Sequence, residues 1–447
     1  FNPEFMFGVE KFDVVIGNPP YVSLERIKEN KVEYIKSYEV SASRGDLYTL
    51  FYERGLKLTE TGTGILCFIT SNKWMRSGYG EKLRGYFSLK NPLYLLDFGG
   101  FKVFESATVD TNILLIGNRE NRNILQACHL QNDYNRGESL KEYCADRFVG
   151  LKNISSDIWF IGSAEELALK AKIECIGKPL KEWSVKIARG IITGFNEAFI
   201  IDQSKRDELV AKDPKSEEII KPIIRGRDIQ RYSHGWMNQY IIVTKFGSYK
   251  NLPEKYPAVY EHLKQYEKQL KKRGQCKYSR AGKNDLQAEF DGQHHWLELD
   301  NNPKDDYLWM FEGEKIVWIE LVDDGRFAYV EPGIYTEATT FLMTFDRPKY
   351  LVGLMNSKLV NWYFDKICGE SGVGTNRWKK FYVEAIPLPD TKDITKIEKI
   401  EDMVNGILAS KKENQKADIK KFEDEIDQVV YQLYGLTDEE IKIVEGN

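Results

Sequence analysis

The stretch Phe12-Asp13-Val14-Val15-Ile16-Gly17-Asn18-Pro19-Pro20-Tyr21 decides the fold class of this chain. Its first half is a short apolar run that ends in glycine, which is typical of a strand buried on both faces of a sheet. Its second half is a turn, because two successive prolines fix their φ angles and remove two backbone donors. We therefore expect a buried strand that is followed at once by a special turn.

Further apolar runs indicate the rest of a sheet. They occupy residues 65–69, 94–98 and 113–116, and residues 46–58 between them place apolar side chains on one helical face. Short apolar runs that alternate with helical patterns predict an α/β sheet. We assign this sheet to residues 1–150.

The texture changes after the sheet. Over residues 151–390, short aromatic and β-branched runs are separated by Gly, Asn, Asp and Pro turns, which indicates an α+β domain with its clearest helix over residues 254–272. Residues 391–447 are highly charged and predict two amphipathic helices, either packed as a hairpin on the main body or left as a solvated tail. Their apolar positions are Ile397, Ile400, Val404, Ile407, Leu408, Phe422, Ile426, Val429, Val430 and Leu433.

Composition excludes several classes of protein. The 447 residues carry a net charge of −4, which excludes a uniformly basic nucleic-acid coat but leaves room for a local basic cleft. No stretch approaches the ~20 apolar residues that a membrane span needs. The six cysteines form no C-x-x-C pair and the five histidines form no H-E-x-x-H, so we expect reduced thiols, no metal and a cytoplasmic location.

The turn of residues 18–21 carries the sharpest chemical signal. It presents two acceptors, the side-chain oxygen of Asn18 and the carbonyl of Pro19, beside the flat ring of Tyr21. This set suits a planar amine with two N–H groups, such as the exocyclic amine of adenine. That amine is a poor nucleophile because its lone pair is delocalised, and accepting both protons moves its nitrogen toward a tetrahedral, attacking geometry. An ordinary turn at the end of a strand is the alternative interpretation.

Several motifs together resemble one enzyme family. The landmarks are residues 12–21, 46–51, 64–75, 101–104 and 109–115, and then 190–199, 222–229, 354–359, 377–389 and 434–441. They look like the TaqI-like (gamma-class) N6-adenine DNA methyltransferases of type II and type IIG restriction–modification systems. The resemblance implies an incomplete Rossmann-like methyltransferase sheet, with residues 1–150 as the C-terminal half of the catalytic domain. It also implies a DNA target-recognition domain over residues 151–390 and a C-terminal helical segment over residues 391–447.

The resemblance also implies a cofactor and roles for particular residues. S-adenosylmethionine would donate the methyl group to an adenine flipped out of double-stranded DNA. Asn18, Pro19 and Pro20 would form the turn that holds the amine, and Tyr21 and Phe104 would stack on the two faces of the base. The helix with Tyr48 and Phe51 would contact the cofactor.

One feature departs from the family pattern. Only 17 residues precede Asn18, too few for the glycine-rich loop and acidic residue that bind most of the cofactor in the family. We therefore expect the C-terminal part of a longer protein that by itself lacks methyl transfer. An endonuclease, which relatives of this size often carry upstream, is not visible here.

Basic residues of the second region are candidates for DNA contact. The stretch 264–283 holds eight basic residues against one acid, and residues 225–228 and 371–380 add two more basic loops. The candidate residues are Arg225, Arg227, Lys271, Lys272, Arg273, Thr375, Asn376, Arg377 and Lys379. Solvated helix ends and structural salt bridges remain equally compatible with these patterns.

Two other functions stay open. One is a methyltransferase that acts on protein glutamine or on RNA, because the same turn also suits a side-chain amide. The other is a DNA specificity module without catalysis. The sequence predicts neither the recognition site nor the oligomeric state.

Overall fold

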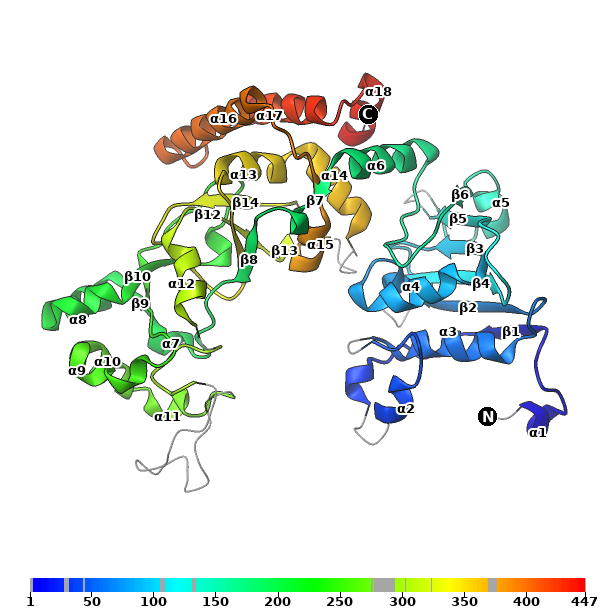
Figure 1. Ribbon diagram of the computed structural model, residues 1–447, viewed down its shortest axis with the longest axis horizontal. Helices are drawn as coiled ribbons and strands as arrows, with labels where there is room; N and C mark the ends of the chain where they lie inside the picture. The colour runs from blue at the N-terminus through cyan, green and yellow to red at the C-terminus, as the bar shows by residue number, and fades with distance from the viewer. Residues whose placement is uncertain are drawn as a thin grey trace. The chain divides into compact units, whose positions relative to one another are not determined.

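The computed structural model describes the following residues: 3–27, 32–42, 45–104, 109–130, 134–274, 276, 294–301, 303–322, 324–368 and 376–446. The chain forms two compact units, which are described separately (Figure 1). The first comprises Phe1–Cys175, Tyr363–Arg377 and Asp438–Asn447, and the second comprises Ile176–Trp362 and Trp378–Thr437. This division differs from the expected boundaries at 150 and 390. Residues 151–175 belong to the first unit, and the helices α16 (Ile394–Glu413) and α17 (Lys420–Leu433) of the charged C-terminal segment fold with the second unit.

A six-stranded sheet organises the first unit, in the order β1-β2-β4-β3-β5-β6. The strands are β1 (Val14–Gly17), β2 (Ile65–Ser71), β3 (Asn91–Asp97), β4 (Thr111–Gly117), β5 (Leu125–His129) and β6 (Val149–Leu151). β1 runs parallel to β2 and β3 runs parallel to β5, while β4 is antiparallel to both β2 and β3. The carboxyl ends of β1, β2, β3 and β5 consequently lie at one edge of the sheet. The four strands predicted in this region are confirmed.

One face of this sheet is covered by α3 (Leu47–Leu58) and α4 (Glu81–Ser88) (Figure 1). The ring of Tyr52 from α3 meets the ring of Phe87 from α4 edge-on, with 4.9 Å between ring centroids. Trp74, fully buried, packs against both rings. The predicted helix over residues 46–58 is confirmed, and its apolar side forms the core of the unit.

The opposite face is open at β1. Val14 and Ile16 are 52% and 77% exposed, and their neighbours across β2, Ile65 and Cys67, are only half-buried. The expectation that the first strand is buried on both faces is therefore wrong for this structure. β1 is also an edge strand of the sheet that the described residues form, so its outer backbone edge pairs with no further strand among them.

Further α-helices also belong to the first unit. They are α1 (Pro3–Phe7), α2 (Val32–Lys36), α5 (Leu140–Ala145), α6 (Ala164–Ile176) and α18 (Asp438–Glu445).

The second unit contains two four-stranded sheets, in the orders β15-β10-β11-β9 and β14-β12-β16-β8. Their strands are β8 (Lys186–Arg189), β9 (Ile200–Asp202), β10 (Ile220–Ile224), β11 (Gln239–Ile242), β12 (Lys315–Ile319), β14 (Phe327–Val330), β15 (Tyr335–Thr336) and β16 (Thr340–Thr344). One large core of buried residues, from Ile191 to Leu342, joins the two sheets. The α+β prediction for this region is confirmed.

The long helix expected over residues 254–272 is wrong. Three short helices stand there instead: α9 (Leu252–Lys255), α10 (Pro257–Lys264) and α11 (Glu267–Leu270). Pro257 explains the first break, because proline lacks a backbone donor and disfavours helical geometry in the residue before it. Tyr256 accordingly has φ −136° and ψ 64°.

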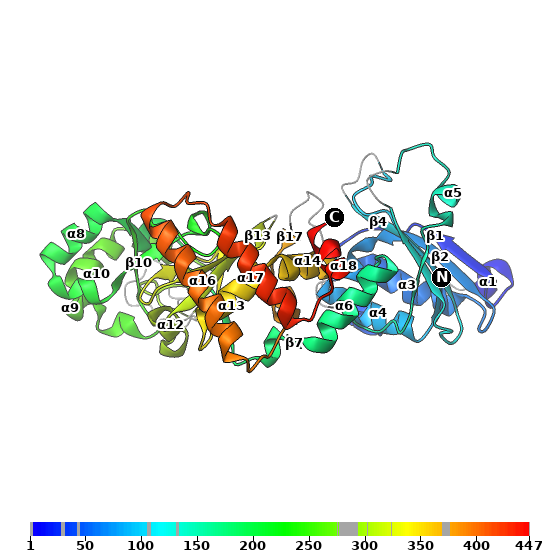
Figure 2. The same cartoon turned by 90° about the horizontal axis from the view of Figure 1, so that it is seen from above.

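Two antiparallel helices of the C-terminal segment, α16 (Ile394–Glu413) and α17 (Lys420–Leu433), pack on α13 (Pro348–Asn356) (Figure 2). Of the predicted apolar positions, Ile397, Ile400, Val404, Ile407, Ile426, Val429 and Val430 are buried. Of the two arrangements considered, the packed hairpin is therefore confirmed and the solvated tail is wrong for these two helices.

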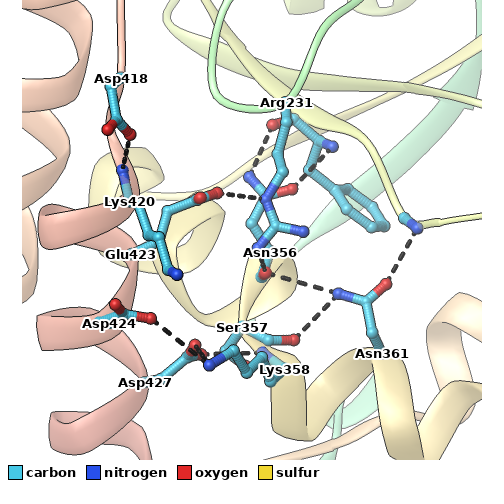
Figure 3. Close-up of polar contacts among 12 residues, drawn as sticks. Arg231, Asn356, Ser357, Lys358, Asn361, Asp418, Lys420, Glu423, Asp424 and Asp427 are labelled. Atoms are coloured by element: carbon cyan, nitrogen blue, oxygen red, sulfur yellow. Dashed lines mark hydrogen bonds and ion pairs between the residues drawn. The ribbon is translucent and has the colours of Figure 1, made fainter.

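A cluster of polar residues connects the hairpin of α16 and α17 to the rest of the second unit (Figure 3). Arg231 pairs with Glu423 of α17 at 2.6 Å and donates to the carbonyl of Asn356 at the end of α13. Asp427 of α17 accepts the backbone N–H of Lys358 at 2.8 Å, at the start of α14 (Lys358–Ile367). A carboxylate at a helix N-terminus satisfies a donor that the helix itself cannot satisfy.

Candidate functional site

The turn predicted to be catalytic lies at the carboxyl end of β1. Asn18 is exposed and Pro19 is buried. The hydroxyl of Tyr21 lies 3.0 Å from Oδ1 of Asn18 and 3.3 Å from the carbonyl oxygen of Ile69 on β2, so it can donate to either. An amide oxygen has two lone pairs, so Oδ1 of Asn18 keeps an acceptor position for a ligand while Tyr21 restrains its orientation.

A second segment braces this turn from the side. The N–H of Leu47 donates to the carbonyl of Val22 at 2.8 Å, and Tyr48 meets Tyr21 edge-on with 6.1 Å between ring centroids. Tyr48 is completely buried, its hydroxyl lies 2.8 Å from that of Tyr79, and burial raises its pKa well above the usual value. Tyr48 therefore supports the ring of Tyr21 as a neutral phenol, and it offers no surface to a cofactor in this structure.

The other candidate cofactor residue points outward. Phe51 lies on the outer side of α3 and is 41% exposed. An exposed aromatic ring on a helix that starts next to the turn is available to stack on a planar ligand.

A row of polar residues crosses the same edge of the sheet, and sequence reasoning missed it. Thr70 on β2 pairs with Asn112 on β4, Asn112 pairs with Asp97 on β3, and Asp97 pairs with His129 on β5. Directly paired residues point to the same face of a sheet. The first three are completely buried, while the side chain of His129 is 27% exposed. The row leads from the strand beside the turn to the surface.

Asp97 is the charged centre of the row. Complete burial raises the pKa of Asp97, but its hydrogen bond with His129 and the guanidinium of Arg76 lower it more, so the net shift is downward. Asp97 is therefore an ionised carboxylate inside the unit, which is rare unless the charge is paired. The only sequence signal was a lone acid at the end of an apolar strand.

Phe104 lies beyond the end of β3, after a loop that starts at the same edge as the turn. It is half-buried. The strand order thus brings Asn18, Tyr21 and the loop of Phe104 to one edge from two separate parts of the chain. This edge carries the acceptor Oδ1 of Asn18, an aromatic ring on each of two loops, and no strong base within the turn itself.

The residues of the second unit that are predicted to contact DNA differ in how exposed their side chains are. The side chain of Arg227 is 66% exposed, and its Nε lies 4.0 Å from the carboxylate of Asp228. Lys272 and Lys379 are exposed, and Arg225 is half-buried. These four side chains are available to phosphate or base edges.

Two other basic residues are engaged within the unit. Lys271 is 12% exposed and pairs with Glu267 at 2.6 Å. Arg273 is buried, and its guanidinium donates to the carbonyls of Thr193, Trp296 and Glu298 at 2.7 to 2.9 Å. The prediction that Arg273 contacts DNA therefore conflicts with its position, because a guanidinium saturated by buried carbonyls does not reach a phosphate.

The last candidate loop, residues 371–380, is described only from residue 376 onward. Thr375 lies outside the described residues, as does the basic part of residues 277–283. Asn376 and Arg377 form the short strand β17 (Asn376–Arg377).

In the described part of the chain, no group of three His, Cys, Asp or Glu side chains is arranged to hold a metal ion. None of the helices described there is long and apolar enough to cross a membrane.

Two family models match the chain. Residues 1–104 match the Eco57I restriction–modification methylase, and residues 221–388 match the TaqI-like C-terminal specificity domain. The first match contains the turn of residues 18–21 and Phe104. The second contains Arg225, Arg227 and Lys379.

Whole proteins are also similar to this chain. The type II methyltransferase M.BstVI of Geobacillus stearothermophilus is 24% identical over 97% of this chain and 75% of its own length. M.PaeR7I of Pseudomonas aeruginosa is 28% identical over 57% of this chain and 45% of its own length. The type IIL restriction–modification enzyme MmeI, solved in complex with DNA, aligns with a TM-score of 0.65 at 13% identity over 100% of this chain and 57% of its own. The chain thus spans three quarters of the first relative and less than two thirds of the other two.

Proposed function

We propose that this chain, in which residues 1–104 match the Eco57I restriction–modification methylase and residues 221–388 match the TaqI-like C-terminal specificity domain, takes part in transferring a methyl group from S-adenosylmethionine to the N6 amine of an adenine in a specific DNA sequence. The observation that carries the proposal is the turn of residues 18–21 at the carboxyl edge, where Tyr21 restrains the acceptor oxygen of Asn18. The specificity-domain match supports DNA rather than protein glutamine or free RNA as the substrate.

The turn performs the chemistry by holding and polarising the amine. The target base must leave the duplex, because its amine cannot be attacked inside the helix. Asn18 Oδ1 and the Pro19 carbonyl accept the two N–H groups, which localises the nitrogen lone pair toward the incoming methyl group. Tyr21 and Phe104 stack on the two faces of the base, worth roughly 1–3 kcal/mol for each stacked ring. After transfer, the surplus proton on nitrogen leaves along one of these hydrogen bonds to water.

The cofactor supplies a methyl group activated on a sulfonium, and the described residues meet only part of its needs. Phe51 fits a ring that stacks on the cofactor's adenine, whereas buried Tyr48 does not contact it directly. The bare apolar face of β1, at Val14 and Ile16, supports the further proposal that the main cofactor-binding elements are not among the described residues. Calorimetry of this chain with S-adenosylmethionine tests this point, and tight binding would contradict it.

The second unit is proposed to read the DNA. Exposed Arg227, Lys272 and Lys379 supply the positive charge that follows phosphates, and such contacts make affinity fall steeply with salt. The relative MmeI was solved in complex with DNA, which supports the same partner for this chain.

Methyl transfer to unmodified DNA, measured on the protein with its cofactor-binding elements present, tests the proposal. Asn18→Ala should lower transfer at least about a hundredfold, because it removes an acceptor that acts on the reacting nitrogen. Its DNA affinity should stay within about twofold of the parent, since Asn18 contributes no phosphate contact. Undiminished transfer by Asn18→Ala would refute the assigned role. If that protein bound one DNA sequence selectively but transferred no methyl group, the specificity module without catalysis would be favoured.

A further inference from the structure

Asp97 joins three separate segments of the first unit. Its Oδ1 accepts from Nδ2 of Asn72 at 2.9 Å and from the backbone N–H of Gly99 at 3.1 Å. Its Oδ2 lies 3.0 Å from Nδ1 of His129 and 3.9 Å from the guanidinium of Arg76. One buried carboxylate therefore fixes the segment after β2, the start of the loop after β3, and the end of β5.

The loop after β3 is shaped for this arrangement at its first turn. Gly99 has φ +51°, a conformation that favours glycine, and a Cβ on it would sit 2.7 Å from Cε1 of His129. Gly100, the next residue, has open space around its Cα. The imidazole of His129 thus packs against Gly99 while it contacts Asp97, so a side chain at residue 99 would collide with the ring.

Further contacts carry this constraint along the loop. The N–H of Phe98 donates to the carbonyl of Thr111 at 3.0 Å, and that of Phe101 donates to the carbonyl of Phe98 at 2.9 Å. The rings of Phe101 and Tyr134 meet edge-on with 5.0 Å between centroids. The loop is therefore held from its first residue up to Phe101, just before Phe104.

We propose that Asp97 is a positioning residue that acts through this loop, holding Phe104 where it stacks on the extruded base. The role of Phe104 rests on the proposed function, whereas the control of the loop by Asp97 does not. The alternative is that the carboxylate of Asp97 only stabilises the first unit. A structural role would loosen the whole sheet when Asp97 is changed, but a positioning role loosens the loop first.

Amide hydrogen exchange of the intact chain separates these two roles without any need for activity. Asp97→Asn and Gly99→Ala should each raise exchange in residues 98–104 by about tenfold or more, because each breaks the first turn of the loop. Gly100→Ala is the matched control and should leave exchange unchanged. Unchanged exchange in residues 98–104 of Asp97→Asn, or an equal increase in β2 and β4, would overturn the proposal.

A double-mutant cycle with Phe104 tests the second half of the proposal in the active enzyme. Asp97→Asn should lower kcat by about tenfold with little change in KM for DNA, since the loop acts on the extruded base rather than on duplex binding. In a Phe104→Ala background the same substitution should have almost no further effect, because its route of action is gone. Independent, additive effects would overturn the proposed route. Absence of methyl transfer in the parent enzyme would refute the proposed function alone, and the exchange result would still decide the role of Asp97.

Discussion

Replacement of Arg273 is the substitution whose outcome the structure fixes most sharply. Its sequence context is a basic stretch, which predicts a DNA contact, yet its side chain is only 7% exposed. The guanidinium donates to the carbonyls of Thr193, Trp296 and Glu298, and its Nε donates to that of Leu270 at 3.1 Å. It therefore connects the end of α11 to two distant loops.

The cost of Arg273→Ala follows from what the truncation leaves behind. Each buried carbonyl that loses its donor costs about 1–3 kcal/mol, and the carbonyls of Thr193, Trp296 and Glu298 lose the guanidinium here. Partial relaxation and entry of water reduce the sum, so we expect a loss of about 3–5 kcal/mol in the free energy of unfolding of the second unit. Arg273→Lys should recover only part of this loss, because an ammonium cannot reach all of these carbonyls.

Urea denaturation followed by tryptophan fluorescence measures this loss, and Lys272→Ala is the matched control. Lys272 is exposed, so its removal should change stability by less than about 0.5 kcal/mol. If Lys272 contacts a phosphate, the slope of log affinity against log salt should fall by about one unit. The reasoning would be refuted if Arg273→Ala kept the stability of the parent while weakening DNA binding with a shallower salt dependence.

Three further substitutions test other parts of the structure. Burial raises the pKa of Asp427 to about 6, above the unfolded value of about 3.9, so ionisation of Asp427 lowers the free energy of unfolding as pH rises between these two values. Asp427→Asn should remove up to about 3 kcal/mol of that loss. Urea denaturation midpoints between about pH 4 and pH 8 measure it. The pKa of Asp97 is shifted downward, so its contribution is present above the unfolded value of about 3.9 and is lost as pH falls below it. Asp97→Asn should flatten the stability loss below about pH 5 in the same assay. Gly353→Ala places a Cβ 2.5 Å from Cγ2 of Ile400, and it should lower the melting temperature by separating α13 from α16, at a cost of about 1–3 kcal/mol.

The sequence predicted those parts of the fold that depend on local pattern. Strands β1 to β4 and helix α3 follow from apolar periodicity over a few residues, and the turn of residues 18–21 follows from its two prolines. The prediction of one helix over residues 254–272 was wrong because it considered the pattern of apolar and charged residues but not Pro257. Local chemistry outweighs periodicity at such a residue.

The polar row and the burial of Arg273 could not be predicted, because both depend on pairing between distant segments. Thr70, Asn112, Asp97 and His129 lie on four strands, and only the register of those strands places them side by side. In the same way, a guanidinium in a run of charges gives no sign that buried carbonyls surround it. Non-local register and backbone acceptors leave no periodic trace in a sequence.

The first strand shows that a mismatch between sequence and structure is informative. Val14, Val15 and Ile16 form an apolar run of the kind selected for burial on both faces, yet two of these side chains face outward in this structure. Polar or charged side chains usually protect a free edge of this kind, and none does so here within the strand. The run therefore fits a sheet that is continued and covered at β1 when the protein works. The same side of the sheet adjoins the turn of residues 18–21, so whatever completes β1 also completes the surroundings of Asn18. On the proposal that the main cofactor-binding elements lie outside the described residues, binding of S-adenosylmethionine and protection of β1 should rise together, because the same elements would supply both.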